Sequence, residues 1–131
     1  MTGQPGPDIP MLEVRNVSQY YPGVQALSAV DFSLARGEIV GLVGHNGAGK
    51  STLTRIISGV ERPMTGDILI NGRVTVLTKP SEALDAGIAV VPQQLSLVPL
   101  MSVRDNITLG VRERRRDVVR RADQVASTLG I

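Results

Sequence analysis

The chain has 131 residues, enough for one modest hydrophobic core and its covering elements. Its 14 Lys and Arg residues against 12 Asp and Glu give a net charge of +2, so overall charge points to no particular partner. There is no cysteine, which excludes disulfides and thiolate metal sites, and no apolar run is long enough to span a membrane.

The first ten residues combine three prolines and two glycines with no basic side chain. This composition predicts a disordered leader and is unlike a secretory signal peptide. We therefore expect a cytoplasmic protein. Apolar residues then alternate over residues 11–20 and 26–34, so each segment predicts a strand with one buried face. A turn at residues 21–24 would join the two strands.

Residues 38–43 are short, apolar and β-branched, which is typical of a buried parallel strand. The next stretch, Gly44 to Thr52, fits the phosphate-loop pattern G-x-x-x-x-G-K-[ST]. A helical apolar stripe follows and should end at Gly59, a favourable residue after a helix. The stripe consists of Leu53, Ile56, Ile57 and Val60.

A strand, a Gly-rich loop and a helix together predict phosphate binding rather than a plain connecting turn. Glycines let the backbone N–H groups point inward, and the helix N-terminus adds its positive dipole end. Lys50 would supply a mobile positive charge for the β- and γ-phosphates, and the hydroxyl of Ser51 could ligate Mg²⁺.

The remaining elements follow from local signals. Asn71-Gly72 between apolar arms predicts a hairpin over residues 67–74, and a short helix is expected over residues 80–86. Residues 88–91 predict a second buried strand, followed by a loop over residues 92–101. Ser102 and Asp105 resemble a capping box that opens a helix ending at Gly110, and a last amphipathic helix is expected over residues 117–129. No internal repeat or domain linker is evident.

From about Met11 to Ile131 the sequence resembles the ATP-binding cassette (ABC) proteins, above all the ATP-binding subunits of bacterial ribose, galactose and xylose importers. The similar segments are Tyr21-Pro22-Gly23-Val24-Gln25-Ala26-Leu27, Gly44 to Leu53, Val91 to Pro99 and Ser102 to Gly110. Gln94 departs from the sugar-importer pattern, which usually has Glu there. The resemblance implies an α/β P-loop NTPase (RecA-like) core with an antiparallel β subdomain, in the N-terminal part of one cassette.

The resemblance also implies roles for individual residues. Tyr21, rather than its neighbour Tyr20, would stack on adenine, and Gln93, rather than Gln94, would lie near Mg²⁺ and the attacking water. His45 occupies a variable position and is expected to be a solvated spectator. Nucleotide would be bound by Tyr21, Gly44, Asn46, Gly47, Ala48, Gly49, Lys50, Ser51 and Thr52, the last reaching the α-phosphate. Metal would be bound by Ser51 and Gln93, and Lys50 and Gln93 would contribute to an incomplete catalytic set.

The implied function is that of an ATP-binding subunit, with ATP and Mg²⁺ as cofactors, that couples ATP binding and hydrolysis to sugar import. Its partners would be membrane permease subunits and a second cassette in head-to-tail contact, on the inner face of the cell membrane. The family's acidic strand end (Walker B), catalytic Glu, signature and switch His are missing from these 131 residues. The chain therefore looks like a fragment, truncated before the signature helix, that would bind nucleotide weakly at most and not hydrolyse it.

Other readings remain open. The same loop could serve a soluble cassette protein acting on ribosomes or DNA, a small-molecule kinase or GTPase, or a binding fragment without chemistry. The arginines at 112, 114, 115, 116, 120 and 121 lack interleaved aromatics and have acids among them, so a solvated helix face is expected rather than a nucleic-acid site. Because two all-apolar strands need covering and pairing, the chain alone should be marginally stable or prone to aggregate.

Overall fold

The structure is a computed structural model that describes residues 9–91, 97–109 and 115–130. The chain divides into two compact units, residues 1–90 and 91–131. Gln93, Gln94, Gly110 and most of the predicted leader lie outside the described residues. Within the described ranges, no helix combines the length and the apolar character needed to cross a bilayer.

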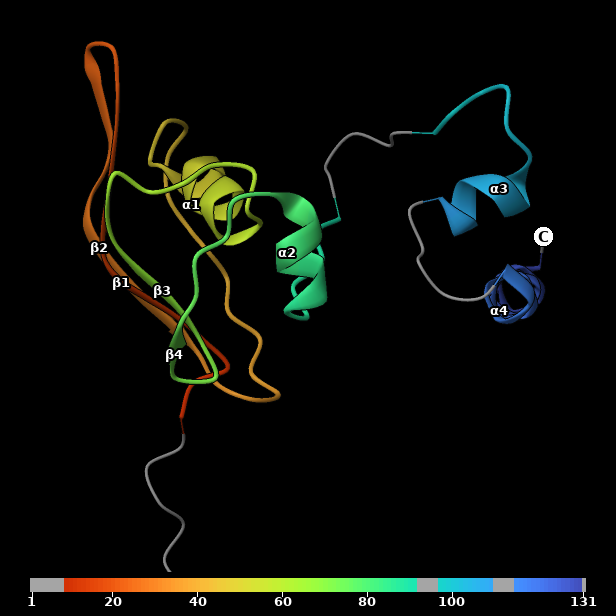
Figure 1. Ribbon diagram of the computed structural model, residues 1–131. Helices are drawn as coiled ribbons and strands as arrows, with labels where there is room; N and C mark the ends of the chain where they lie inside the picture. Colours follow the sequence, from red (N-terminus) through yellow and green to blue (C-terminus); the bar gives the residue numbers. More distant parts are fainter. Residues whose placement is uncertain (1–8, 92–96, 110–114, 131) are drawn as a thin grey trace, which may run out of the picture. The chain divides into compact units, whose positions relative to one another are not determined.

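The first unit is built on a four-stranded antiparallel sheet in the order β2-β1-β3-β4 (Figure 1). Its strands are β1 (Leu12–Tyr21), β2 (Val24–Leu34), β3 (Thr65–Ile70) and β4 (Arg73–Val74). The first two strands confirm the predicted pair. Their turn is tighter than predicted, because Tyr21 and Val24 already pair with each other across Pro22-Gly23.

A bulge in β1 turns two valines towards the core. Val14 and Val17 are both buried although they are an odd number of positions apart, which a regular strand does not allow. The register shifts between them, and Asn16 has a positive φ of 50°. The Asn16 N–H donates to Asp31 Oδ1 at 2.9 Å, which satisfies a group that the bulge removes from the ladder. The bulge therefore places both valines on one face.

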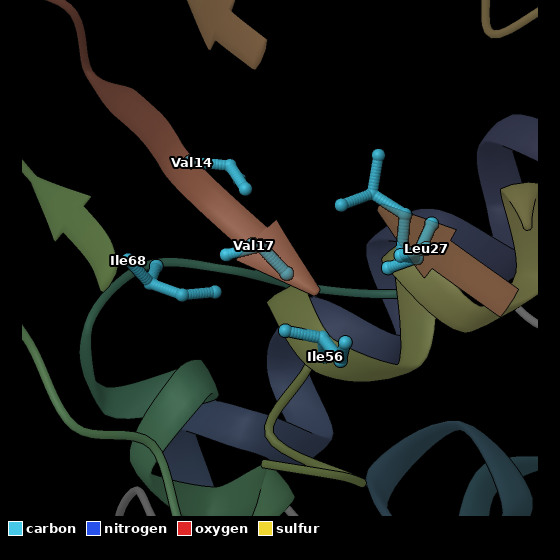
Figure 2. Close-up of a cluster of buried hydrophobic side chains, with 6 residues drawn as sticks. Val14, Val17, Leu27, Ile56 and Ile68 are labelled. Atoms are coloured by element: carbon cyan, nitrogen blue, oxygen red, sulfur yellow. The ribbon is translucent and has the colours of Figure 1, made fainter. Parts of the chain in front are cut away.

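Helix α1 (Lys50–Ile57) supplies the other side of the core, as its apolar stripe predicts (Figure 1). Leu53 and Ile56 point into the sheet, whereas Val60 lies beyond the helix and is exposed. Two nested hydrogen bonds end the helix. Gly59 N–H donates to the Ile56 carbonyl, and Val60 N–H donates to the Arg55 carbonyl. The buried cluster in Figure 2 consists of Val14, Val17, Leu27, Leu53, Ile56 and Ile68.

Two local predictions after α1 are confirmed. Asn71 and Gly72 have φ values of 50° and 75°, which both residues of a tight two-residue hairpin turn require, and they join β3 to β4. Helix α2 (Pro80–Asp85) starts at the predicted proline and is followed by Gly87 with a φ of 90°. Ala83 fixes the helix to the unit through its buried methyl group.

The two predicted parallel strands are not formed. Residues 38–43 and 88–91 are irregular, and Ile39 and Val43 are 99% and 97% exposed. An apolar strand needs hydrogen-bonding neighbours and covered faces. In the described residues the only sheet is the antiparallel one, where β1 already has β2 and β3 on its two sides. The prediction of a strand at these positions was therefore wrong for this structure.

The second unit contains α3 (Val103–Thr108) and α4 (Arg115–Leu129). Ser102 caps α3 as predicted, since its hydroxyl accepts from Asp105 N–H at 3.1 Å and donates to Asp105 Oδ2 at 2.6 Å. Among the α4 side chains that the structure describes, Val118 and Ala122 are buried, and Arg104 of α3 donates to Asp123 Oδ1 at 2.9 Å. Arg112 and Arg114 lie outside the described residues.

Candidate phosphate-binding site

The Gly-rich loop is pressed against strand β2 at its last glycine. Gly49 has a φ of 83° and is the residue immediately before α1. A Cβ at this position would lie 2.4 Å from the carbonyl oxygen of Ala26 and 2.6 Å from Leu27 Cδ2. Both the backbone conformation and the close approach therefore require glycine here. This contact fixes the start of α1 relative to the sheet.

The N-terminus of α1 presents backbone donors without an acceptor of its own. The first bond of the helix runs from Leu53 N–H to the Gly49 carbonyl at 2.9 Å. The N–H groups of residues 50–52 precede that bond and have no intrahelical acceptor. Gly49 has no side chain that could cap them. Together with the positive end of the helix dipole, these donors form a site suited to a phosphate.

Lys50 lies across the loop that it follows. Its Nζ donates to the carbonyl of Gly44 at 2.6 Å and to that of His45 at 2.8 Å. An ammonium group has three donors, so one remains for an anion at the same place. The structure thus brings Gly44, the first residue of the predicted loop, into contact with Lys50 near its other end.

Of the two hydroxyls that follow Lys50, Ser51 is exposed and Thr52 is half-buried. Mg²⁺ is usually held by one or two protein oxygens together with substrate phosphates and waters. An exposed hydroxyl beside a phosphate site fits that donor set, so Ser51 would hold the ion when nucleotide brings it. In the described part of the chain, no group of three or more His, Asp or Glu side chains could hold a metal by itself.

Tyr21 lies beside the same helix. Its hydroxyl donates to Glu61 Oε2 at 2.7 Å, and this bond, followed by loss of hydration, raises the pKa of the phenol. The nearby side chain of Thr52 acts on that pKa in the opposite direction. Tyr21 is half-buried, whereas Tyr20 is 50% exposed. Glu61 in turn bonds to Arg55 of α1, so Tyr21, and not its neighbour, is linked to the helix that begins at the phosphate loop.

The other predicted site residues have simpler surroundings. Asn46, Gly47 and Ala48 form the exposed tip of the loop, where Ala48 N–H donates to the His45 carbonyl at 3.1 Å. The His45 side chain is also exposed, with Nδ1 2.8 Å from the carbonyl of Asn46. These positions leave the loop tip open to solvent. Gln93, predicted to be near the metal, lies outside the described residues.

Sequence reasoning missed two residues next to the site, Gln19 and Glu61. Glu61 accepts from Tyr21 and, at 2.6 Å, from Gln19 Nε2. The predicted strand ended at Tyr20 and the register shifts on both sides of Gln19, so strand periodicity alone did not predict that Gln19 is buried. A buried amide requires a partner. That partner is 42 residues further along the chain, and no local pattern identifies it.

Comparison with known proteins places these features in one family. A family model described as ABC transporter matches residues 27–131. The ribose import ATP-binding protein RbsA 1 of Rubrobacter xylanophilus is 44% identical over 128 residues, 93% of this chain and 26% of the relative. The arabinose import ATP-binding protein AraG 2 of Burkholderia cenocepacia is 44% identical over 113 residues, 86% of this chain and 22% of the relative. The chain thus spans about a quarter of these relatives' length.

Solved structures agree on the fold. MJ1267, an ATP-binding cassette of an ABC transporter, superposes with a TM-score of 0.79 at 23% identity, over 92% of this chain and 54% of that one. The ATP-binding cassette MJ0796, in a dimeric post-hydrolysis state bound to ADP and Pi, gives a TM-score of 0.72 at 25% identity, over 92% of this chain and 58% of that one. The chain therefore has the P-loop NTPase fold of these cassettes, as predicted.

Proposed function

The chain belongs to the ABC transporter family, and from this premise we propose that it binds ATP with Mg²⁺ as the nucleotide-binding part of a sugar importer. The observation that carries the proposal is the convergence at the start of α1. The Lys50 ammonium and the free N–H groups of the helix lie together there, and the side chain of Thr52, two residues further on, is close enough to the Tyr21 phenol to lower its pKa. These groups match the two parts of a nucleotide: the ammonium and the N–H groups suit its anionic phosphate chain, and the tyrosine ring suits its flat base.

In this proposal the phosphate chain occupies the N-terminus of α1. The backbone N–H groups and the third donor of Lys50 bind the β- and γ-phosphates, and the Thr52 hydroxyl reaches the α-phosphate. The ring of Tyr21 stacks on the adenine, which offers a π-face to any aromatic side chain. Bound Mg²⁺ would neutralise phosphate charge. Its protein ligands would be Ser51 and Gln93, the second of which lies outside the described residues.

Substrate, partners and location follow from the family and from the names of the relatives. Proteins named for ribose and arabinose import share 44% identity with this chain. We therefore assign the whole protein to monosaccharide import, on the cytoplasmic face of the membrane, with permease subunits and a second cassette as partners. Nucleic acid is not among the proposed partners. On α4, Arg120 lies 3.7 Å from Asp117, as expected of a solvated helix face with paired charges.

We further propose that these 131 residues bind ATP without hydrolysing it. Hydrolysis needs a group that positions the attacking water and carboxylates that hold Mg²⁺. Glu61, the acid described beside the site, already accepts hydrogen bonds from Tyr21 and Gln19. Steady phosphate release above that of a Lys50→Ala control, in material free of other ATPases, would contradict this proposal.

Binding is tested by titrating Mg-ATP in a calorimeter or against a fluorescent nucleotide. The chain has only two lysines, Lys50 and Lys79, which gives a matched pair of variants. Lys50→Ala removes a charge-assisted hydrogen bond to phosphate, so we expect affinity to fall roughly ten- to hundredfold. Lys79→Ala removes an exposed ammonium that pairs with Glu82 at 3.7 Å, and it should leave affinity unchanged.

Equal affinities of the two lysine variants would overturn the phosphate-loop assignment. Mg-GTP in the same titration reports on selectivity for the base. The importer assignment has a separate test, uptake of labelled ribose, galactose and arabinose by cells whose intact gene carries Lys50→Ala. Unchanged uptake of all three sugars would contradict it.

A further inference from the structure

The carboxylate of Glu61 is held in place by groups that do not depend on Tyr21. Its own N–H donates to the Arg55 carbonyl at 3.2 Å, which ties the residue to the C-terminal end of α1. Arg55 Nη2 lies 3.3 Å from Oε2. On the other side Gln19 Nε2 donates to Oε1 at 2.6 Å. Glu61 is thus oriented from both the helix and the sheet.

Gln19 is itself fixed, which makes it a rigid support. Its side chain is only 6% exposed. Both ends of its amide are used, because Oε1 accepts from Met64 N–H at 3.0 Å while Nε2 donates to Glu61. A buried amide with both ends paired has one orientation. The Glu61 carboxylate is therefore held by a side chain that is itself fixed to the backbone of β1 and of the segment after α1.

Tyr21 completes this chain of contacts at its exposed end. Its phenol donates to Glu61 Oε2 at 2.7 Å. A bond at the far end of the side chain removes the rotational freedom of the ring. The residue is only half-buried, so part of the ring remains accessible to a ligand.

We propose that Glu61 is a positioning residue for nucleotide binding, which holds the ring of Tyr21 at a fixed distance from the phosphate loop so that base and phosphates are bound together. The inference rests on the proposed function, because it assigns Tyr21 to the base. Holding the ring before the ligand arrives avoids the entropy of ordering it on binding. Glu61 does not touch the nucleotide, and it acts through the tyrosine hydroxyl.

This role predicts that the tyrosine hydroxyl matters although the ring does the stacking. Tyr21→Phe keeps the aromatic face and loses the bond to Glu61. We expect it to weaken ATP binding about two- to tenfold, the cost of ordering one side chain. Tyr21→Ala removes the stacking surface itself and should weaken ATP binding roughly five- to hundredfold. Tyr20→Phe is the matched control and should change nothing.

The discriminating ligand is inorganic tripolyphosphate, which carries the phosphates without a base. Affinities for Mg-ATP and Mg-tripolyphosphate are measured for Tyr21→Phe, Glu61→Ala and the double variant. We expect each single change to weaken ATP alone, and the double variant to be no weaker than the weaker-binding single variant. If circular dichroism shows that Glu61→Ala does not fold, Glu61→Gln replaces it, since its amide oxygen still offers an acceptor to Gln19.

Three results would overturn the proposal. Equal losses for ATP and tripolyphosphate would mean that Glu61 supports the loop as a whole. Additive losses in the double variant would mean that Glu61 does not act through the Tyr21 hydroxyl. Unchanged ATP affinity in Tyr21→Phe would mean that the hydroxyl has no role. Failure of the proposed function looks different, because Lys50→Ala would then leave the affinities for both ligands unchanged.

Ultraviolet titration of the tyrosines gives a spectroscopic readout of the contact. The pKa of Tyr21 is raised above 10.0 chiefly by its bond to Glu61. Replacing Glu61 should therefore lower the pH at which this phenol ionises, and Tyr20→Phe identifies which transition belongs to Tyr21. An unchanged titration in the Glu61 variant would contradict the contact on which the proposal depends.

Discussion

Replacing Gly49 by alanine tests how the phosphate loop is held in place. The new Cβ would meet two obstacles at once. The alanine would have to adopt a φ of 83°, where residues with a Cβ are strained. Its Cβ would lie 2.4 Å from the Ala26 carbonyl oxygen. Because the second obstacle is backbone, the residue cannot be accommodated by rotating a side chain. The loop and β2 would have to move apart.

Gly23 separates the two costs. It has a similar φ of 76°, but a Cβ there would meet nothing within 4 Å. Gly23→Ala should therefore cost only the backbone strain, about 1–2 kcal/mol. Gly49→Ala adds an overpacking cost of about 1–3 kcal/mol. The total for Gly49→Ala is then roughly 2–5 kcal/mol, and the difference between the two variants measures the contact with β2.

The assay is equilibrium unfolding in urea without nucleotide, followed by circular dichroism. With a typical dependence on denaturant, the midpoint of Gly49→Ala should lie about 1 M below that of Gly23→Ala. Coincident midpoints would refute the reasoning, because the loop would then not be pressed against β2. Unfolding of Gly49→Ala without denaturant, while Gly23→Ala stays folded, would agree with it.

Three other predictions concern stability and association. Ile56→Ala should lower the free energy of urea unfolding by about 2–5 kcal/mol, because Ile56 is 1% exposed. Val60→Ala, at an exposed position, should lower it by about 0.5 kcal/mol or less. Similar costs for the two variants would contradict the assignment of Ile56 to the core. The Thr78 N–H and hydroxyl lower the pKa of Glu82, so its stabilising contribution is present above the ordinary value of 4.5 and is lost as pH falls through the lowered value. Glu82→Gln should therefore be less stable than the parent near neutral pH and equal to it once the pH has fallen below the lowered pKa, and a difference that persists throughout an acid titration would count against the contact. Replacing Ile39 and Val43 by threonine should reduce self-association in sedimentation velocity, because both side chains are almost fully exposed; equal association of parent and variant would place the adhesive surface elsewhere.

Features that depend on neighbouring residues could be predicted from the sequence. The Gly-rich turn before α1, the stripe of α1, the Asn71-Gly72 turn and the cap at Ser102 each need only a few adjacent positions, and the structure contains all four. Residues 38–43 needed more than their own pattern. An apolar segment becomes a β-strand only when neighbouring strands are present to hydrogen-bond with its backbone. Those neighbours are not among the described strands.

The network behind Tyr21 shows a second limit. Gln19 and Glu61 are 42 positions apart, and neither belongs to a motif. They meet because the bulged strand β1 and the end of α1 pack on the same core. Contacts of this kind follow from the tertiary fold, so sequence could point to Tyr21 as a site residue without indicating what holds it.

The antiparallel sheet accounts for the shape of the phosphate site. The segment that leads into the loop is irregular and exposed, so it cannot be what positions the loop. Gly49 instead abuts β2, Leu53 and Ile56 attach α1 to the valines of β1, and Glu61 links the end of that helix to Tyr21. Each of these contacts joins α1 to β1 or β2. The proposed half-site for nucleotide is therefore organised by the helix and the antiparallel strands, and ordering of the 38–43 segment would add support from the other side of the loop.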